Sequence, residues 1–364
     1  MGDGHRIIHG VAGSGKTLIL GYRCLHLARV LNKPILVMCF NITLAARLRS
    51  MMEGNKVNDR VHVYHFHDWC CEMLKRYHID KPKAGSGYVE RLVEQVIRAV
   101  DDRQIPKCQY GALMVDEGHD FEADWLRLIV QMVDADTKSL LLLYDDAQSI
   151  YKNDKALDFS LSSVGVHARG RTTVLKLNYR NTDEILEFAY GFARNYLVPE
   201  TSDDDHIPLV EPKSVGRHGY IPCLKQFSSF DEEAKYVARN LIRMHEEGMP
   251  WSDMCVIYRS RWMGEKLQQE IRAEGAPTQW LNTQFEKKSY KPGEESIKLM
   301  TIHSSKGLEF PLVAISGIGY MPGKRCDLSS EAKLLYVAMT RSTDKLLITY
   351  DKQSDFVRLL KNAS

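Results

Sequence analysis

The sequence lacks the features of several protein classes. Its eight cysteines include no CxxC pair, which argues against a disulfide framework and against a cysteine zinc site. No run approaches the ~18 apolar residues of a membrane span. The first residues, MGDGHR, lack the apolar core of a secretion signal. We therefore expect a protein without a membrane segment that resides in a reducing cytoplasm.

Neither sign of charge dominates, with 49 Lys and Arg against 47 Asp and Glu and a net charge of +2. This balance neither establishes nor excludes nucleic-acid binding, which needs a basic stripe rather than a basic average. Charged residues make up 26% and hydrophobic residues 44%, which argues against disorder. At roughly 150 residues per domain, 364 residues suggest about two domains.

Short apolar runs alternate with segments of helical period. Runs this apolar are typical of parallel strands covered on both faces, so the pattern predicts an α/β fold. The expected strands are residues 35–39, 112–115, 140–143, 174–177, 255–258, 298–301, 312–316 and 346–349. Gly, His and Arg replace the apolar pattern at 165–172, which predicts one domain over 1–172 and a second over 173–364.

A phosphate-binding motif stands near the start of the chain. Residues 10–17, GVAGSGKT, match GxxxxGK[ST] between a short apolar run and an apolar helical segment. Gly10, Gly13 and Gly15 would let backbone N–H groups close around phosphate oxygens. Lys16 would meet the β- and γ-phosphates, and Thr17 would ligate Mg²⁺. The alternative is a chance glycine-rich turn.

Two carboxylates end the strand expected at 112–115. Asp116 at the strand tip suits Mg²⁺, directly or through water, and Glu117 could polarise an attacking water. Acidic residues also end strands for solubility alone. Together with the upstream glycine-rich loop, however, the pair predicts hydrolysis of a nucleoside triphosphate such as ATP.

Seven further motifs follow in a fixed order. They are LVMCFN at 36–41, HFH at 65–67, DEGHD at 116–120, YDDAQSIY at 144–151, LNYRN at 177–181, TIHSSKGLEF at 301–310 and LYVAMTR at 335–341. The series resembles superfamily 1 DNA helicases of the UvrD/Rep type, most closely the helicase bodies found behind a nuclease-related (NERD) domain. The resemblance covers nearly the whole chain and implies two RecA-like P-loop lobes with ATP between them.

The resemblance also implies roles for five residues. Gln148 would sense the γ-phosphate, Tyr179 would stack on the adenine, and Glu309 would lie near the ribose. Arg180 and Arg341 would reach the γ-phosphate from the second lobe, where they stabilise charge when the cleft closes. Each has an alternative: a surface ion pair for the arginines, core packing for Tyr179, and a solvated turn for Glu309.

The strand-facing motifs of the family imply a track for single-stranded DNA, or for DNA with a single-stranded tail. The residues at those positions are Phe40, Asn41, His67, Tyr151, Thr301 and His303. Arg47 or Arg49 is a further candidate for backbone phosphate. Ordinary packing is the alternative for each aromatic or histidine, and the five tryptophans, which lie outside the motifs, are interpreted as structural.

The sequence departs from the family at several places. No aromatic follows Tyr151 at the position of the usual DNA platform, and His119 replaces the usual glutamine. Accessory insertions are small or absent, with room for a small helical insert at about 68–110. Family members carry an adenine-reading glutamine upstream of the glycine-rich loop, whereas only nine residues precede Gly10 here, so we expect weakened adenine selectivity. We expect adenine selectivity to rest mainly on Tyr179, unless a larger parent or a companion chain supplies that segment.

The leading hypothesis is an ATP-dependent translocase or helicase on single-stranded DNA, with 3′-to-5′ polarity implied by resemblance. A second hypothesis is an ATP-gated switch that activates a partner nuclease and does not unwind alone. A third is an incomplete or inactive fragment. A P-loop kinase is disfavoured because it leaves the 177–181 and 335–341 motifs unexplained.

Overall fold

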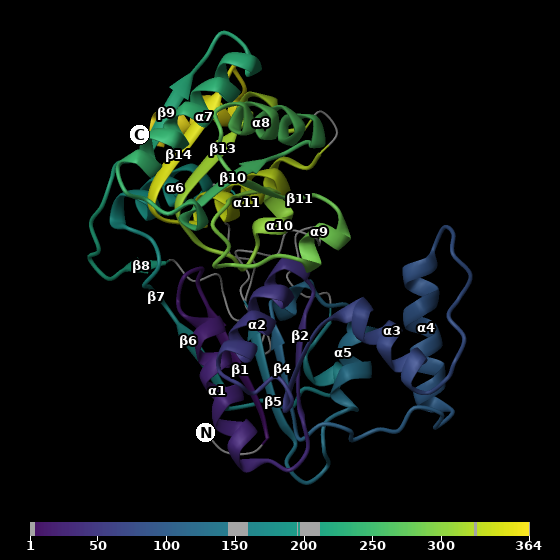
Figure 1. Ribbon diagram of the computed structural model, residues 1–364. Coiled ribbons are helices and arrows are strands. Elements are labelled where there is room, and N and C mark those ends of the chain that lie inside the picture. Colours follow the sequence, from purple (N-terminus) through teal and green to yellow (C-terminus); the bar gives the residue numbers. More distant parts are fainter. Residues whose placement is uncertain (1–3, 145–158, 195, 197–211, 324–325, 364) are drawn as a thin grey trace.

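The computed structural model describes residues 4–144, 159–194, 196, 212–323 and 326–363. It contains two α/β lobes, one above the other in Figure 1, each built on a six-stranded parallel sheet. Gln148 and Tyr151 lie outside the described residues, so their roles stay predictions.

The first lobe is built on a sheet with the strand order β3-β2-β4-β5-β1-β6, in which every pairing is parallel. Its strands are β1 (His5–Gly10), β2 (Ile35–Cys39), β3 (Val61–His65), β4 (Ala112–Asp116), β5 (Ser139–Tyr144) and β6 (Thr172–Leu175). The helices α1 (Lys16–Val30), α2 (Ile42–Gly54) and α5 (Ala123–Val130) connect them. The central strands β2, β4 and β5 are buried along their whole length, as expected for a sheet covered on both faces.

A pair of helices lies at one side of this lobe (Figure 1). Helix α3 (Phe66–Arg76) packs against α4 (Tyr88–Asp101), where Leu92, Val93 and Val96 form a buried apolar stripe. The two helices occupy the position of the small insert expected at about 68–110.

The second lobe has the strand order β11-β12-β10-β13-β14-β9, again parallel throughout. Its strands are β9 (Cys223–Gln226), β10 (Met254–Tyr258), β11 (Thr278–Leu281), β12 (Ile297–Thr301), β13 (Phe310–Ser316) and β14 (Ser342–Tyr350). Its helices are α6 (Asp183–Ala193), α7 (Phe230–Glu246), α8 (Arg261–Ala273), α9 (Gln284–Lys288), α10 (Ile302–Ser305), α11 (Leu328–Met339) and α12 (Asp355–Ala363). Between β11 and β12 the chain forms only the short helix α9, which packs against α2 of the first lobe.

Seven of the eight expected strands form where the apolar runs predicted them. The run at 174–177 is not one strand buried on both faces, because residues 174–175 end β6 and Leu177 begins a second strand. Strand β6 is mostly exposed, because it lies at the edge of the first sheet with a neighbour on one side only. A separate short strand, β7 (Leu177–Asn178), pairs with β8 (Lys213–Ser214). The first sheet therefore continues through Leu175, three residues beyond the expected end of the first domain at 172.

Each sheet has an apolar core on both of its faces, made by the buried strand residues and the helices that cover them. In the described part of the chain, no helix is both long and apolar enough to cross a membrane.

Candidate nucleotide site between the two lobes

The glycine-rich loop follows β1 and leads into α1. Gly13 and Gly15 have φ angles of +72° and +84°, a left-handed conformation that glycine adopts without steric cost. A Cβ atom at Gly13 would lie 2.7 Å from Arg180 Cβ and 2.8 Å from Asn178 Oδ1. Glycine at 13 is thus required both by the turn and by the approach of the segment that leads into the second lobe.

Lys16 and Thr17 open helix α1, where the backbone N–H groups have no helical partners. The Lys16 ammonium donates hydrogen bonds to the carbonyl of Gly10 and, over 3.0 Å, to that of Val11. The Thr17 hydroxyl donates to Asp116 Oδ2 over 3.0 Å. The two bonds of Lys16 keep a buried cation at the centre of the loop. The bond of Thr17 joins the loop to the acidic end of β4.

Asp116 and Glu117 stand side by side at the end of β4. Burial, reinforced by the neighbouring Glu117, raises the pKa of Asp116 to about 6. Glu117 has a φ angle of 53°, which is strained for a residue with a side chain and typical of functional sites. Its Oε2 atom lies 3.4 Å from His119 Nε2.

The donor set at this end of the site fits Mg²⁺. Thr17 and Asp116 supply a hydroxyl and a carboxylate, and Mg²⁺ usually binds one or two protein oxygens and completes its octahedron with phosphate and water. Among the described residues, no group of three or more His, Cys, Asp or Glu is arranged as an all-protein metal cage. The pair of Thr17 and Asp116 suits a metal that arrives with a phosphate ligand.

The second lobe faces the loop with two arginines. Arg180 Nε donates to Glu309 Oε2 over 2.7 Å. Burial alone would raise the pKa of Glu309, but Arg180 and Arg47 outweigh it and lower that pKa to about 2. Arg341 is 1% exposed and donates to the carbonyls of Val337 (2.9 Å) and Leu308 (3.3 Å). The guanidinium of Arg341 is thus fixed in place by its own lobe.

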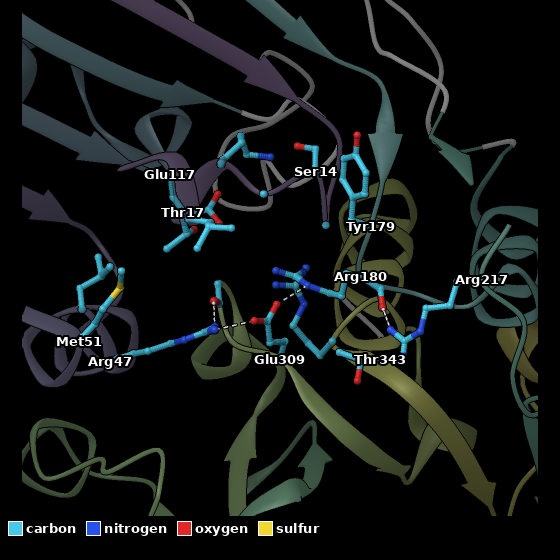
Figure 2. Close-up of a pocket in the computed structure, with 17 residues that line it drawn as sticks. Ser14, Thr17, Arg47, Met51, Glu117, Tyr179, Arg180, Arg217, Glu309 and Thr343 are labelled. Carbon is cyan, nitrogen blue, oxygen red and sulfur yellow. Dashed lines mark hydrogen bonds and ion pairs between the residues drawn. The ribbon is translucent and has the colours of Figure 1, made fainter. Parts of the chain in front are cut away.

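These groups line one cavity of about 410 Å³ between the lobes. Figure 2 shows Thr17 and Glu117 on one side and Arg180 and Glu309 on the other. Tyr179 lies beside Ser14 with 59% of its surface exposed, as a stacking platform would be. Every described residue that we expected to bind the nucleotide through its side chain lies at this cavity or directly against it.

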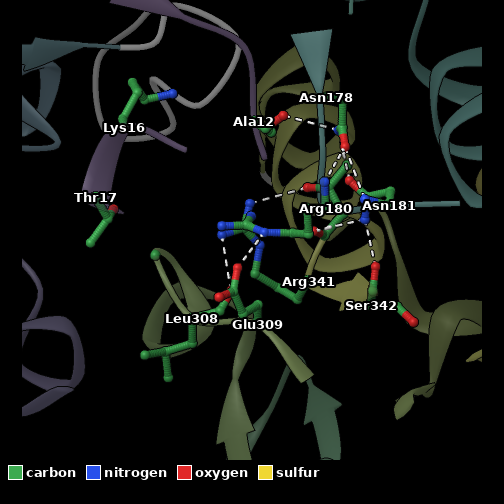
Figure 3. Close-up of polar contacts among 12 residues, drawn as sticks. Ala12, Lys16, Thr17, Asn178, Arg180, Asn181, Leu308, Glu309, Arg341 and Ser342 are labelled. Carbon is green, nitrogen blue, oxygen red and sulfur yellow. Dashed lines mark hydrogen bonds and ion pairs between the residues drawn. The ribbon is translucent and has the colours of Figure 1, made fainter. Parts of the chain in front are cut away.

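Two asparagines, for which no role was expected from the sequence, hold the site together. Asn178 is fully buried: its amide donates to Ala12 O over 3.0 Å, and its Oδ1 accepts from the backbone N–H of Arg180 over 2.9 Å (Figure 3). The Asn181 amide donates to the carbonyls of Thr340 (3.2 Å) and Ser342. The segment 178–181 is therefore bonded to the glycine-rich loop on one side and to the residues around Arg341 on the other. The sequence feature that could have indicated this role is the position of the two asparagines, one on each side of Tyr179 and Arg180.

Replacing Asn178 with alanine is expected to weaken both nucleotide binding and folding. The change leaves the Ala12 carbonyl and the Arg180 N–H without their buried partner, at a cost of about 1–3 kcal/mol. Nucleotide titration and urea denaturation measure the two effects. Asn282→Ala, at a partly buried position outside the cavity, is the control, and an Asn178→Ala variant indistinguishable from it would contradict this role.

The residues expected to face DNA divide into two groups. Asn41 and Thr301 already have structural partners: Asn41 caps α2 and donates to His303 O (3.1 Å) and Lys306 O (3.0 Å), and Thr301 caps α10. Burial, followed by the nearby Arg259, lowers the pKa of His303 to about 4. DNA contact by these three residues stays a prediction.

Phe40 and His67 belong to an aromatic cluster where β2 and β3 end. The ring of Trp125 stacks on Phe40 at 5.7 Å and meets His67 edge-on at 5.1 Å. Trp125, interpreted from the sequence as structural, packs half-buried against the core of the first lobe and also belongs to this cluster. The sequence position of Trp125 could not predict its contact with Phe40 and His67, because α5 brings the three rings together only in the folded chain.

A buried ion pair connects the lobes next to the acidic residues. Lys306 is fully buried, and its ammonium lies 2.7 Å from both carboxylate oxygens of Asp120 and 2.8 Å from His119 Nε2. His119, which replaces the family's usual glutamine, therefore still makes a polar contact across the lobe junction.

Comparison with known proteins agrees with this architecture. The family model of the UvrD-like helicase C-terminal domain matches residues 173–289 and 280–353, and an AAA domain model matches residues 2–154. A probable DNA helicase II homolog of Mycoplasma capricolum is 24% identical over 254 residues, which are 65% of this chain and 34% of that protein.

Two further relatives carry similar descriptions. The mitochondrial ATP-dependent DNA helicase HMI1 of Saccharomyces cerevisiae is 22% identical over 355 residues, or 75% of this chain and 50% of that protein. DNA helicase II of Escherichia coli is 42% identical over 64 residues, or 16% of this chain and 9% of that protein. The matches thus span half or less of these relatives. A likeness to NERD-associated helicases stays a prediction. With the ordered motifs and the two parallel sheets, these matches show that the chain belongs to the UvrD/Rep family of superfamily 1 DNA helicases.

Proposed function

We propose that the chain is an ATP-driven motor that moves along single-stranded DNA in the 3′-to-5′ direction. One observation carries this proposal: a single cavity is lined by Lys16, Thr17 and Glu117 from the first lobe and by Arg180 and Arg341 from the second. A site divided in this way works only when both lobes are positioned together, so hydrolysis there is coupled to the relative position of the lobes.

The chain's own residues supply most of the chemistry. Lys16 would exchange the carbonyls of Gly10 and Val11 for phosphate oxygens, which are stronger acceptors. Thr17 and Asp116 would hold Mg²⁺, which neutralises phosphate charge when bound. Glu117 would orient the attacking water. The arginines would stabilise the charge that develops on the phosphoryl group.

The aromatic cluster of Phe40, His67 and Trp125 supports the choice of a single strand. Each base offers a flat face to an aromatic ring, so such a surface binds single strands with little sequence preference. All eight cysteines are unpaired, which supports a cytoplasmic location as part of the same proposal.

The direct test is ATP turnover with and without a single-stranded oligonucleotide, for the wild type, Lys16→Ala and Arg341→Ala. We expect the oligonucleotide to raise wild-type turnover roughly tenfold or more, because a strand across both lobes favours the closed cavity. Lys16→Ala should remove turnover in either condition, and blunt duplex is the control ligand. Normal nucleotide affinity without stimulation by single strands would contradict a DNA motor.

An ATP-gated switch for a partner nuclease is the second candidate. It is favoured by the segment between β11 and β12, which forms only α9 and offers little structure to separate a duplex. The two candidates differ in an unwinding assay on tailed duplex: processive strand separation by the chain alone favours the motor. A tail on either the 3′ or the 5′ side tests the polarity.

A further inference from the structure

Arg47 takes part in the nucleotide cavity although no nucleotide role was expected for it. It lies on α2 of the first lobe, and its guanidinium reaches a loop of the second lobe. There it donates to Gly307 O over 3.1 Å and pairs with Glu309 (Figure 2). From its sequence position we expected only a contact to DNA backbone phosphate.

Glu309 shares its two carboxylate oxygens between two cations. Oε1 pairs with Arg47, and Oε2 accepts from Arg180 over 2.7 Å. The side chain of Arg180 is 14% exposed, so it has little freedom while this pair holds. A triphosphate in the cavity needs the same guanidinium. Its bond to Glu309 is made by Nε, so turning the two Nη groups toward a γ-phosphate would weaken that bond or break it.

We infer that Arg47 is a positioning residue for Arg180, because it stays on Glu309 as the counter-ion when Arg180 moves to the phosphate. Arg47 thereby sets how strongly the cavity prefers a nucleoside triphosphate to a diphosphate. The inference rests on the proposed ATP site and adds a residue from outside its motifs.

Charge neutralisation supplies the physical reason. A carboxylate that loses its only cation in a partly buried site carries an uncompensated charge, which is costly. With Arg47 in place, Glu309 keeps one cation throughout the exchange. The hydrogen bond to Gly307 O favours the place of the Arg47 guanidinium beside Glu309 over a move toward the phosphate.

Arg49, two residues further along α2, provides a matched control. Its Nε donates to Val63 O over 3.0 Å, so it contacts the first lobe and does not line the cavity. Arg47→Gln and Arg49→Gln therefore remove the same charge from the same helix, but only the first acts on Glu309.

The test compares equilibrium affinities for ADP and for a non-hydrolysable ATP analogue, neither of which requires turnover or DNA. Arg47→Gln is expected to lower the affinity for the analogue roughly five- to tenfold, the order for one partly exposed charge pair, and to leave the affinity for ADP unchanged within about twofold. Arg47→Lys keeps the charge and should retain most of the preference. Arg49→Gln should bind both nucleotides with wild-type affinity, because the DNA contact expected of Arg49 plays no part in an assay without DNA. An equal loss for both nucleotides, or no loss, would overturn the inference.

A double-mutant comparison separates exchange at Glu309 from direct phosphate contact. In a Glu309→Gln background no carboxylate competes with phosphate for Arg180, so adding Arg47→Gln should cause no further loss of analogue affinity. The same loss in both backgrounds would mean that Arg47 binds phosphate itself, which contradicts the inference. A wild type that binds neither nucleotide contradicts the proposed function instead. If the wild type binds ADP and the analogue but the variants do not show the selective loss of analogue affinity, only the inference about Arg47 is contradicted.

Discussion

Replacing Arg180 with alanine is expected to lower the kcat of ATP hydrolysis by roughly 10³-fold, the range found when an arginine that stabilises phosphoryl transfer is removed. Its guanidinium lies in the cavity opposite Lys16, Thr17 and Glu117 and is held by Glu309. This charge acts mainly on the transition state, so we expect a smaller rise in KM, roughly five- to tenfold, from the loss of the ground-state contact to the γ-phosphate.

Steady-state turnover across a range of ATP concentrations measures both constants. Arg261→Ala is a suitable control, since Arg261 forms an exposed pair with Glu265 on α8 in the same lobe and does not line the cavity. A kcat for Arg180→Ala within about threefold of the control would rule out a role for Arg180 in transition-state stabilisation.

Replacing Lys306 with methionine is expected to lower the free energy of unfolding by about 3–5 kcal/mol. The change leaves the Asp120 carboxylate buried without its cation, and this carboxylate is 1% exposed. Because the pair joins the two lobes, the loss should fall on their docking, so denaturation should separate into two transitions, one for each lobe.

Urea denaturation followed by fluorescence and by circular dichroism tests this expectation. Lys288→Gln is the matched control, because Lys288 also pairs across the lobes, with Asp68 at 2.7 Å, but its side chain is 42% exposed. An exposed pair contributes about 0–1 kcal/mol. Equal losses for the two variants would show that burial of the Lys306 pair adds nothing to docking.

Local patterns in the sequence predicted the sheets and the phosphate-binding loop. The apolar runs at 35–39 and 112–115 form β2 and β4 because a strand buried on both faces must be apolar at every position. The run at 174–177 was predicted to be a strand buried on both faces. Its apolar side chains are instead largely exposed, at a sheet edge and in a second short strand. Strand position within a sheet depends on topology, which periodicity does not encode.

Contacts between distant residues could not be predicted. The partnership of Lys306 with Asp120 spans 186 residues, and that of Arg47 with Glu309 spans 262. Nothing in the local sequence of either member selects the other. The family resemblance supplied Arg180 and Glu309 as separate site residues, while the ion pair between them depends on how the two lobes sit together.

The segment 178–181 has a mechanical consequence. The first lobe holds it through Asn178 and through Tyr179 N–H bonded to Gly13 O at 3.0 Å, and the second lobe holds it through Asn181. If the lobes rotate relative to each other about this segment as a hinge, each atom moves in proportion to its distance from the hinge axis. Arg180 lies at this hinge. Helices α9 and α3 lie on the other side of the lobe junction from β7, and so farther from the hinge axis (Figure 1). A displacement too small to resolve at the phosphates would then become a measurable change in distance between spectroscopic labels on α9 and α3.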